Sequence, residues 1–311
     1  MADLSFDVNK EELFRVLVDL LVEFNRVCSE NDIKYFVVGG TMLGAIRHNG
    51  FIPWDDDIDI AIPRKEYEKL KELAKKGVFR QPYFFQNPST DEGYPKGFSR
   101  LRNSNTTQIP FRDISTNCNR GIFIDIIPLD VVPESISKRE KMISRLFNYK
   151  MIMNSYSRYY SGIGAEGTTK KRAIAYYLIL PLFKCRILTM KGLFNRFEKT
   201  VSQYKESNEE CVGLIACTYG DKRFIWKREL WESKVVWHNF ENIKVPIPER
   251  YDEILTNSYG DYMKPVKEPN NHGDSIYSID VPYNKYVQEH FSELKELWLK
   301  EIASLPTKND C

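Results

Sequence analysis

The chain has 311 residues, of which 42% are hydrophobic and 28% charged, with 45 Lys and Arg against 43 Asp and Glu. This composition indicates a soluble globular protein with a sizeable core, and the near balance of charge argues against a dedicated nucleic-acid-binding surface. Six cysteines without a C-x-x-C pair and four scattered histidines complete no zinc spacing, so we expect reduced thiols and a cytoplasmic location. The polar N-terminus carries no signal-peptide core, and no apolar run reaches the roughly 20 residues of a transmembrane helix.

In chain order, the hydrophobic patterns alternate between helical and strand-like periods. They predict a helix over 10–30, a buried strand over 34–40, a helix capped by Thr41, a strand over 57–62 and a helix over 63–77. Strand-like runs follow at 83–87, 97–109 and 121–130, and residues 137–207 are helical and basic. The last third mixes short elements and ends in a helix over 286–302. We therefore expect an α+β fold with helical additions.

The stretch VVGGTMLGAIRHNGFIPWDDDIDIAI, residues 37–62, contains four carboxylates in five positions, namely Asp55, Asp56, Asp57 and Asp59. On a strand, Asp57 and Asp59 project from one face, and Asp55 joins them if the strand starts early. Crowded carboxylates raise one another's pKa unless a cation neutralises them, and hard oxygen ligands suit Mg²⁺ or Mn²⁺. A metal site is the favoured interpretation, and an acidic turn exposed to water is the alternative.

A further carboxylate, Asp125, stands among isoleucines in GIFIDIIPLD, residues 121–130. A charge within an apolar strand is costly without a partner. Three roles stay open for Asp125: a third metal ligand, a general base, or an ion pair with a neighbouring arginine.

The segment VVGGT ends a strand and begins a helix. Backbone N–H groups of such a turn can face an anion at the helix N-terminus, so Gly39, Gly40 and Thr41 are candidates for phosphate binding beside the cation. Glycines for phosphate and aspartates for metal are separate parts of phosphoryl-transfer chemistry.

Several polar side chains are weaker candidates for contacting the substrate. Arg47, Arg100 and Arg102 can clamp a diphosphate or pair with the aspartates. His272 can contact phosphate, transfer a proton, or simply lie in a solvated loop. Trp54 can stack on a base or pack in the core.

The full string of residues 39–62, together with GFSRLRNSNT, GIFIDIIPLD, YGDYMKP and HGD, closely resembles the LicD family. This family includes bacterial phosphocholine transferases and, more distantly, fukutin and fukutin-related protein. The resemblance implies a nucleotidyltransferase-like mixed sheet flanked by helices. It divides the chain into a catalytic core over 1–136, a helical insertion over 137–210, and a C-terminal α/β part over 211–311 that completes the active site.

The resemblance also implies an activity: metal-dependent transfer of phosphocholine from CDP-choline to a hydroxyl of a cell-surface glycan, with release of CMP. The glycan would be a teichoic acid, capsule or lipopolysaccharide precursor. Asp57 and Asp59 would hold Mg²⁺ or Mn²⁺, and Asp125 would complete the site or take the acceptor proton. The alternatives are a CDP-glycerol- or CDP-ribitol-dependent transferase, a nucleotidyltransferase releasing pyrophosphate, and a non-catalytic metal-binding module.

The segment AIAYYLILPLFKCRIL, residues 173–188, is apolar, contains Pro181 and is framed by lysines and arginines. One interpretation is a buried helical hairpin with solvated basic ends. The other is a surface that binds the interface of an anionic membrane. Such a surface would suit a peripheral enzyme that acts on a lipid-linked acceptor at the inner face of the plasma membrane.

Overall fold

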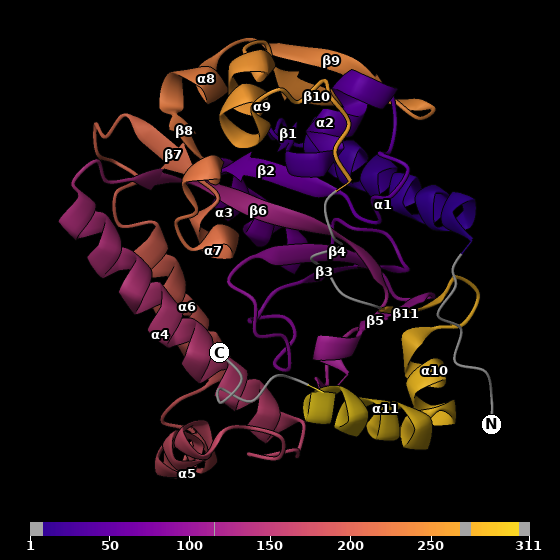
Figure 1. The fold of residues 1–311 in the computed structure, drawn as a ribbon, viewed down its shortest axis with the longest axis vertical. Coiled ribbons are helices and arrows are strands. Elements are labelled where there is room, and N and C mark those ends of the chain that lie inside the picture. The colour runs from indigo at the N-terminus through magenta and orange to yellow at the C-terminus, as the bar shows by residue number, and fades with distance from the viewer. Residues whose placement is uncertain (1–8, 115, 268–274, 305–311) are drawn as a thin grey trace.

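The computed structural model describes residues 9–114, 116–267 and 275–304, which form a mixed β-sheet surrounded by helices (Figure 1). The predicted α+β class is confirmed. The strands of the main sheet are β1 (Phe36–Val37), β2 (Asp59–Pro63), β3 (Tyr83–Gln86), β4 (Ser99–Asn103), β6 (Ile122–Val132), β7 (Cys211–Gly213) and β8 (Ile225–Lys227). Their order is β1-β2-β6-β4-β3, and β7 pairs with the end of β6 and with β8. Only β2 and β6 run parallel among these pairs.

Two smaller antiparallel pairs flank the main sheet. They are β9 (Val235–Phe240) with β10 (Ile243–Pro248), and β5 (Thr107–Pro110) with β11 (Ser275–Ser278). The second pair joins segments more than 160 residues apart, so the C-terminal region is tied to the core.

The helices predicted over 10–30 and 63–77 begin and end close to the expected positions, whereas two other helix predictions need correction. They are α1 (Lys10–Glu30), α2 (Gly39–His48), α3 (Arg64–Lys75), α4 (Ile136–Tyr160), α5 (Lys170–Lys184), α6 (Met190–Val201), α7 (Ile215–Thr218), α8 (Arg228–Glu232), α9 (Tyr251–Tyr259), α10 (Tyr283–Glu289) and α11 (Phe291–Ser304). The single helix predicted over 286–302 was wrong, because the chain breaks at His290 between α10 and α11. Thr41 is not the N-cap of α2, because the helix already begins at Gly39 with Val38 in the cap position.

The hydrophobic core lies between α1 and one face of the main sheet. Leu13, Leu17 and Leu20 on α1 are fully buried, as are Ile58 and Ile60 beside the acidic stretch. Each such side chain contributes about 1.5–3 kcal/mol when it is removed from water. This packing orients the strands, because side chains alternate along β2 and β6 and the residues between the isoleucines must face the other way.

A buried ion pair joins α3 to β6 beneath this core. Arg64 donates to both carboxylate oxygens of Asp130 at 2.7 Å and to Glu198 of α6 at 2.8 Å. Arg64 and Asp130 are almost inaccessible to solvent. The bidentate geometry fixes α3 and α6 against the end of β6.

The helical segment 137–207 extends away from the sheet, with α5 at the lower end of the molecule in Figure 1. Tyr176 and Phe183 are the buried side chains of α5, whereas Ile174, Tyr177 and Leu178 are exposed. The interpretation of residues 173–188 as a buried helical hairpin was therefore wrong. No helix among the described residues is long and apolar enough to cross a bilayer.

Candidate active site

A row of polar side chains crosses the face of the main sheet that lies opposite the core. Asp59 on β2 pairs in register with Asp125 on β6. Asp125 in turn pairs with Arg100 on β4, and Arg100 pairs with Gln86 on β3. Paired positions on neighbouring strands project from the same face. Asp59, Asp125, Arg100 and Gln86, here called the polar row, therefore lie side by side although they span residues 59–125.

Asp125 is held by Arg100. The Nε of Arg100 donates to Oδ1 of Asp125 at 2.6 Å, and its Nη2 lies 3.5 Å from Oδ2. The guanidinium also stacks on Phe123, 3.6 Å from the ring centroid. Burial alone would lower the pKa of Arg100, but the adjacent Asp125 carboxylate outweighs it and raises that pKa. The ion pair that the sequence left open for Asp125 is thus present, with Arg100 as the partner.

Three further carboxylates gather immediately before β2. Oxygens of Asp55, Asp56 and Asp57 lie within 4.8 Å of one another, and all three side chains are half-buried. The strand begins only at Asp59, so Asp57 precedes it, and strand alternation is not what brings Asp57 and Asp59 together. Among the described residues, Asp55, Asp56 and Asp57 form a group close enough to hold a metal ion together, and metal binding by Asp57, Asp59 and Asp125 stays a prediction.

The charges of the polar row nevertheless act on Asp57. Burial raises the pKa of Asp57 well above its usual value, and the charges of Asp59, Asp55, Asp56 and Asp125 raise it further. Four neighbouring carboxylates therefore act on Asp57. A site of hard oxygen donors with this crowding fits a divalent cation such as Mg²⁺ or Mn²⁺.

The glycine turn packs directly against these carboxylates. A Cβ on Gly40 would lie 2.5 Å from Oδ2 of Asp55, and one on Gly39 would lie 3.3 Å from Oδ2 of Asp59. Gly39 also has a φ of +63°, a conformation that side chains disfavour. The hydroxyl of Thr41 accepts a hydrogen bond from the backbone N–H of Asp59 at 2.9 Å. Thr41 thus positions β2, and both glycines let the backbone approach the acidic group closely.

The remaining arginine candidates lie in different surroundings. Arg47 donates to the carbonyl of Tyr262 at 2.7 Å and so holds the segment after α9. Arg102 donates to Gln86 at 2.5 Å and to the carbonyl of Gly121 at 2.6 Å. Burial and neighbouring Arg100 lower the pKa of Arg102 to about 10.

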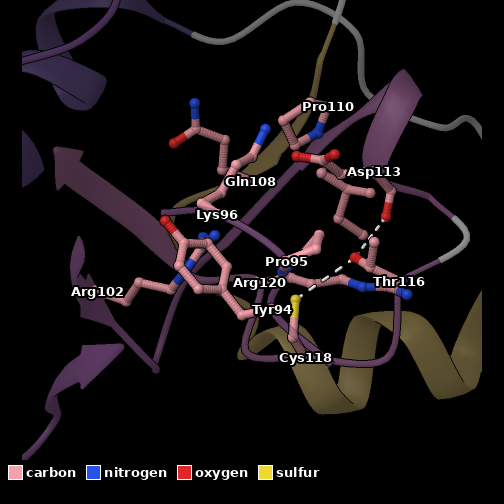
Figure 2. Close-up of a pocket in the computed structure, with 11 residues that line it drawn as sticks. Tyr94, Pro95, Lys96, Arg102, Gln108, Pro110, Asp113, Thr116, Cys118 and Arg120 are labelled. Atoms are coloured by element: carbon pink, nitrogen blue, oxygen red, sulfur yellow. Dashed lines mark hydrogen bonds between the residues drawn. The ribbon is translucent and has the colours of Figure 1, made fainter. Parts of the chain in front are cut away.

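Arg102 lines a cavity of about 10 Å³, which is room for roughly one water molecule. Figure 2 shows its side chain beside Tyr94, with Cys118 and Arg120 on the other side of the ring. Trp54 is half-buried and packs against the core, and His272 lies outside the described residues.

Sequence reasoning missed several residues that reach the acidic group from distant segments. The hydroxyl of Tyr277 on β11 donates to Oδ2 of Asp56 at 3.2 Å, across 221 positions of sequence. The Nζ of Lys10 reaches the carbonyls of Pro53 at 2.9 Å and Asp55 at 3.4 Å. Tyr259, in the YGDYMKP motif, has its hydroxyl 3.7 Å from the position of a Cβ on Gly39. No local pattern distinguishes Tyr277 or Lys10 in the sequence, whereas Tyr259 lies in a motif whose role the sequence does not reveal.

Cys217 on α7 also lies near the polar row. Burial raises the pKa of its thiol, and the charges of Asp59 and Asp125 add to the effect. A thiol that stays protonated is a poor nucleophile, so Cys217 shapes this side of the site rather than reacting there.

The mixed sheet, with an acidic group beside a glycine turn, agrees with the nucleotidyltransferase-like fold that the sequence resemblance implied. Residues 32–156, which include the glycine turn and all five carboxylates, match the family model described as LicD/FKTN/FKRP, nucleotidyltransferase domain. The chain is 27% identical to the lipopolysaccharide cholinephosphotransferase LicD of Haemophilus influenzae over 257 residues, which are 80% of this chain and 89% of that protein. Residues 32–156 therefore resemble the nucleotidyltransferase domain of the LicD family, and most of the chain is similar to a LicD protein.

A second relative has no assigned activity. It is the uncharacterized protein RP689 of Rickettsia prowazekii, which is 31% identical over 119 residues. That match covers 38% of this chain and 40% of the relative.

Proposed function

We propose that this protein transfers phosphocholine from CDP-choline to a hydroxyl of a cell-surface glycan and releases CMP. The observation that carries the proposal is the similarity to a lipopolysaccharide cholinephosphotransferase over 89% of that relative. The acidic group and the glycine turn support it, since both lie within the matched family domain. The acceptor would be a lipopolysaccharide, capsule or teichoic acid precursor.

The proposed reaction needs a divalent cation, for which Mg²⁺ or Mn²⁺ is the candidate. Asp57 and Asp59 would hold it, with Asp55 and Asp56 close enough to Asp57 to share the task. The cation would offset the charge that develops on the diphosphate as its bond breaks. The donor set supports this assignment, because carboxylate oxygens are the ligands that Mg²⁺ prefers.

Within this scheme the chain's own residues orient the reactants. The acceptor oxygen forms a bond to the phosphorus that carries choline, the bond from that phosphorus to CMP breaks, and CMP leaves with the electron pair. The acceptor proton passes to Asp125 if this carboxylate acts as the base, and Arg100 keeps the carboxylate oriented. If Asp125 is a third ligand instead, the proton leaves to solvent.

Arg100 is also the best candidate for contacting the donor. Its Nη1 atom is buried and has no hydrogen-bond partner among the described residues. A buried donor without a partner is unfavourable, and a phosphate oxygen would satisfy it. Gly39 and Gly40 would let the same phosphate approach the backbone at the start of α2.

We test the reaction by nucleotide release. Purified full-length protein is incubated with Mg²⁺ and, separately, CDP-choline, CDP-glycerol, CDP-ribitol or CTP, with and without a glycan acceptor. We expect acceptor-stimulated CMP from CDP-choline, and no release after chelation of the metal. CMP from CDP-glycerol or CDP-ribitol alone would change the donor, and pyrophosphate from CTP would replace the proposal with nucleotidyl transfer.

The location that we propose is the inner face of the plasma membrane, where a lipid-linked acceptor would be accessible. A cytoplasmic protein would meet CDP-choline there as a soluble donor. Fractionation of cells into soluble and membrane pools, with and without a high-salt wash, would test this.

A further inference from the structure

Helix α5 (Lys170–Lys184) presents an apolar face to solvent. Ile174 and Tyr177 are each 62% exposed, Leu178 is 77% exposed, and Ile187 just beyond the helix is 67% exposed. With Leu182, five of the fourteen exposed large hydrophobic side chains in the described residues fall within positions 174–187. Spacings of three and four residues place positions 174, 177, 178 and 182 on one side of the helix. We call these four residues and Ile187 the α5 apolar face.

The opposite side of α5 is firmly packed, so the exposure is not a consequence of a loosely attached helix. Phe183 is fully buried, and its ring centroid lies 5.2 Å from that of Tyr156 and 5.7 Å from that of Tyr159 on α4. Tyr176 is buried on the same side. At the N-terminus of the helix, the Thr169 hydroxyl accepts from the backbone N–H of Arg172. The fold thus holds α5 so that its apolar face points outward.

The charged residues of this stretch of the chain are of one sign. Between Glu166 and Glu198 the sequence contains seven lysines and arginines and no acidic residue, although the whole chain has a formal charge of only +2. They are Lys170, Lys171, Arg172, Lys184, Arg186, Lys191 and Arg196. Lysine and arginine side chains at the ends of an apolar helical face can keep their charges in a headgroup layer while the apolar residues enter the acyl boundary.

We propose that the α5 apolar face and its basic flanks dock the protein on a bilayer that contains anionic phospholipid. The charge complementarity favours lipid over a second copy of this chain, because two copies would bring like-charged flanks together. Docking would hold the enzyme at the surface where a lipid-linked acceptor is anchored. It does not depend on which group the active site transfers.

The test is co-sedimentation of the full-length protein with vesicles of phosphatidylcholine alone or of phosphatidylcholine with phosphatidylglycerol. A triple charge variant combines Lys170→Gln, Lys171→Gln and Arg172→Gln. Its control is a second triple variant that combines Lys227→Gln, Lys234→Gln and Lys244→Gln. The control lysines are exposed and lie on β8, β10 and the segment before β9, at the opposite end of the molecule from α5 (Figure 1). An apolar variant, Ile174→Ser with Leu178→Ser, is compared with Trp237→Ser on β9, which is also exposed.

We expect binding to vesicles with phosphatidylglycerol and much weaker binding to phosphatidylcholine alone. The α5 charge variant should bind about 100-fold more weakly, since each of the three cations near an anionic surface contributes about fivefold. The apolar variant should lose about tenfold or more, because two exposed side chains no longer enter the bilayer. Both controls should bind like the parent protein. All variants should keep their thermal stability, because the altered side chains are exposed.

Equal weakening by the α5 and control charge variants would show unspecific attraction and overturn the proposal. Unchanged binding by the apolar variant would overturn it as well. Light scattering measures the oligomeric state of the parent protein and of the apolar variant. If the parent protein is a dimer and Ile174→Ser with Leu178→Ser converts it to a monomer, the α5 apolar face binds a second copy of the chain, and the proposal is overturned. CMP release from soluble substrates is measured in parallel, so that failure of docking is distinguished from failure of the proposed transfer reaction.

Discussion

Replacing Gly40 with alanine tests whether Asp55 belongs to the active site. The added Cβ would lie 2.5 Å from Oδ2 of Asp55, whereas ordinary contacts begin near 3.4 Å. The carboxylate oxygen therefore has to retreat by about 0.9 Å. Because the Asp55 Cγ already lies at 3.4 Å, a rotation of the carboxylate is sufficient, and the backbone stays in place.

The expected effects on stability and on activity differ in size. Gly40 lies in the first turn of α2, where alanine is favoured over glycine by up to about 1 kcal/mol. This gain offsets the cost of moving Asp55, so we expect the free energy of unfolding to change by less than about 1 kcal/mol. Misplacement of a catalytic group by about 1 Å can reduce turnover about 100-fold. We therefore expect a folded protein with about 100-fold slower CMP release.

The assays are urea unfolding, CMP release from CDP-choline, and the rise in melting temperature on addition of Mg²⁺, which should be smaller in the variant. Gly192→Ala is the matched control, since Gly192 also lies in the first turn of a helix and its added Cβ would meet only the Thr189 hydroxyl, at 3.1 Å. Full activity and an undiminished Mg²⁺ effect in Gly40→Ala would refute the assignment of Asp55 to the site.

Three further predictions concern other parts of the molecule. Asp57→Asn should slow CMP release by at least about 100-fold and abolish the Mg²⁺-induced rise in melting temperature, because it removes the carboxylate whose pKa is raised by burial and by the charges of the other four; a retained Mg²⁺ effect would contradict this. Arg64→Met should lower the free energy of unfolding by about 3–5 kcal/mol in urea titrations, because it leaves Asp130 charged, buried and without its bidentate partner; a loss below about 1 kcal/mol would show that the pair is dispensable. At pH 8, iodoacetamide should modify exposed Cys185 much faster than Cys217, because burial raises the Cys217 pKa and keeps its thiol protonated until the pH approaches that higher value. Peptide mass mapping over time measures both rates, and equal rates would contradict the burial of Cys217.

Local periodicity predicted much of the secondary structure. The helix over Lys10–Glu30 has the predicted bounds, since its apolar stripe needs only neighbours three and four positions away. The alternation of aspartates and isoleucines before residue 62 correctly placed Ile58 and Ile60 in the core. The start of β2 was less predictable, because where a strand begins depends on pairing with β1 and β6.

The same distinction applies to the candidate site. Because a charge within an apolar strand is unfavourable, the sequence predicted that Asp125 has a partner or binds a ligand. Arg100 is that partner. Identifying Arg100 needed the register of β4 against β6, which joins residues 25 positions apart. The contact of Tyr277 with Asp56 was not predictable, because it depends on β11 pairing with β5 near the other end of the chain.

The sequence by itself determined the α+β class, the crowding of four carboxylates around the start of β2, and the family that this string of residues resembles. These properties depend on residue types and on short spacings. Only the tertiary structure decided that Asp55, Asp56 and Asp57 form the close group, that Arg100 holds Asp125, and that the apolar side of α5 faces solvent. Each of these depends on which distant segments pack together, because burial and ion pairing are set by neighbours in space rather than along the chain.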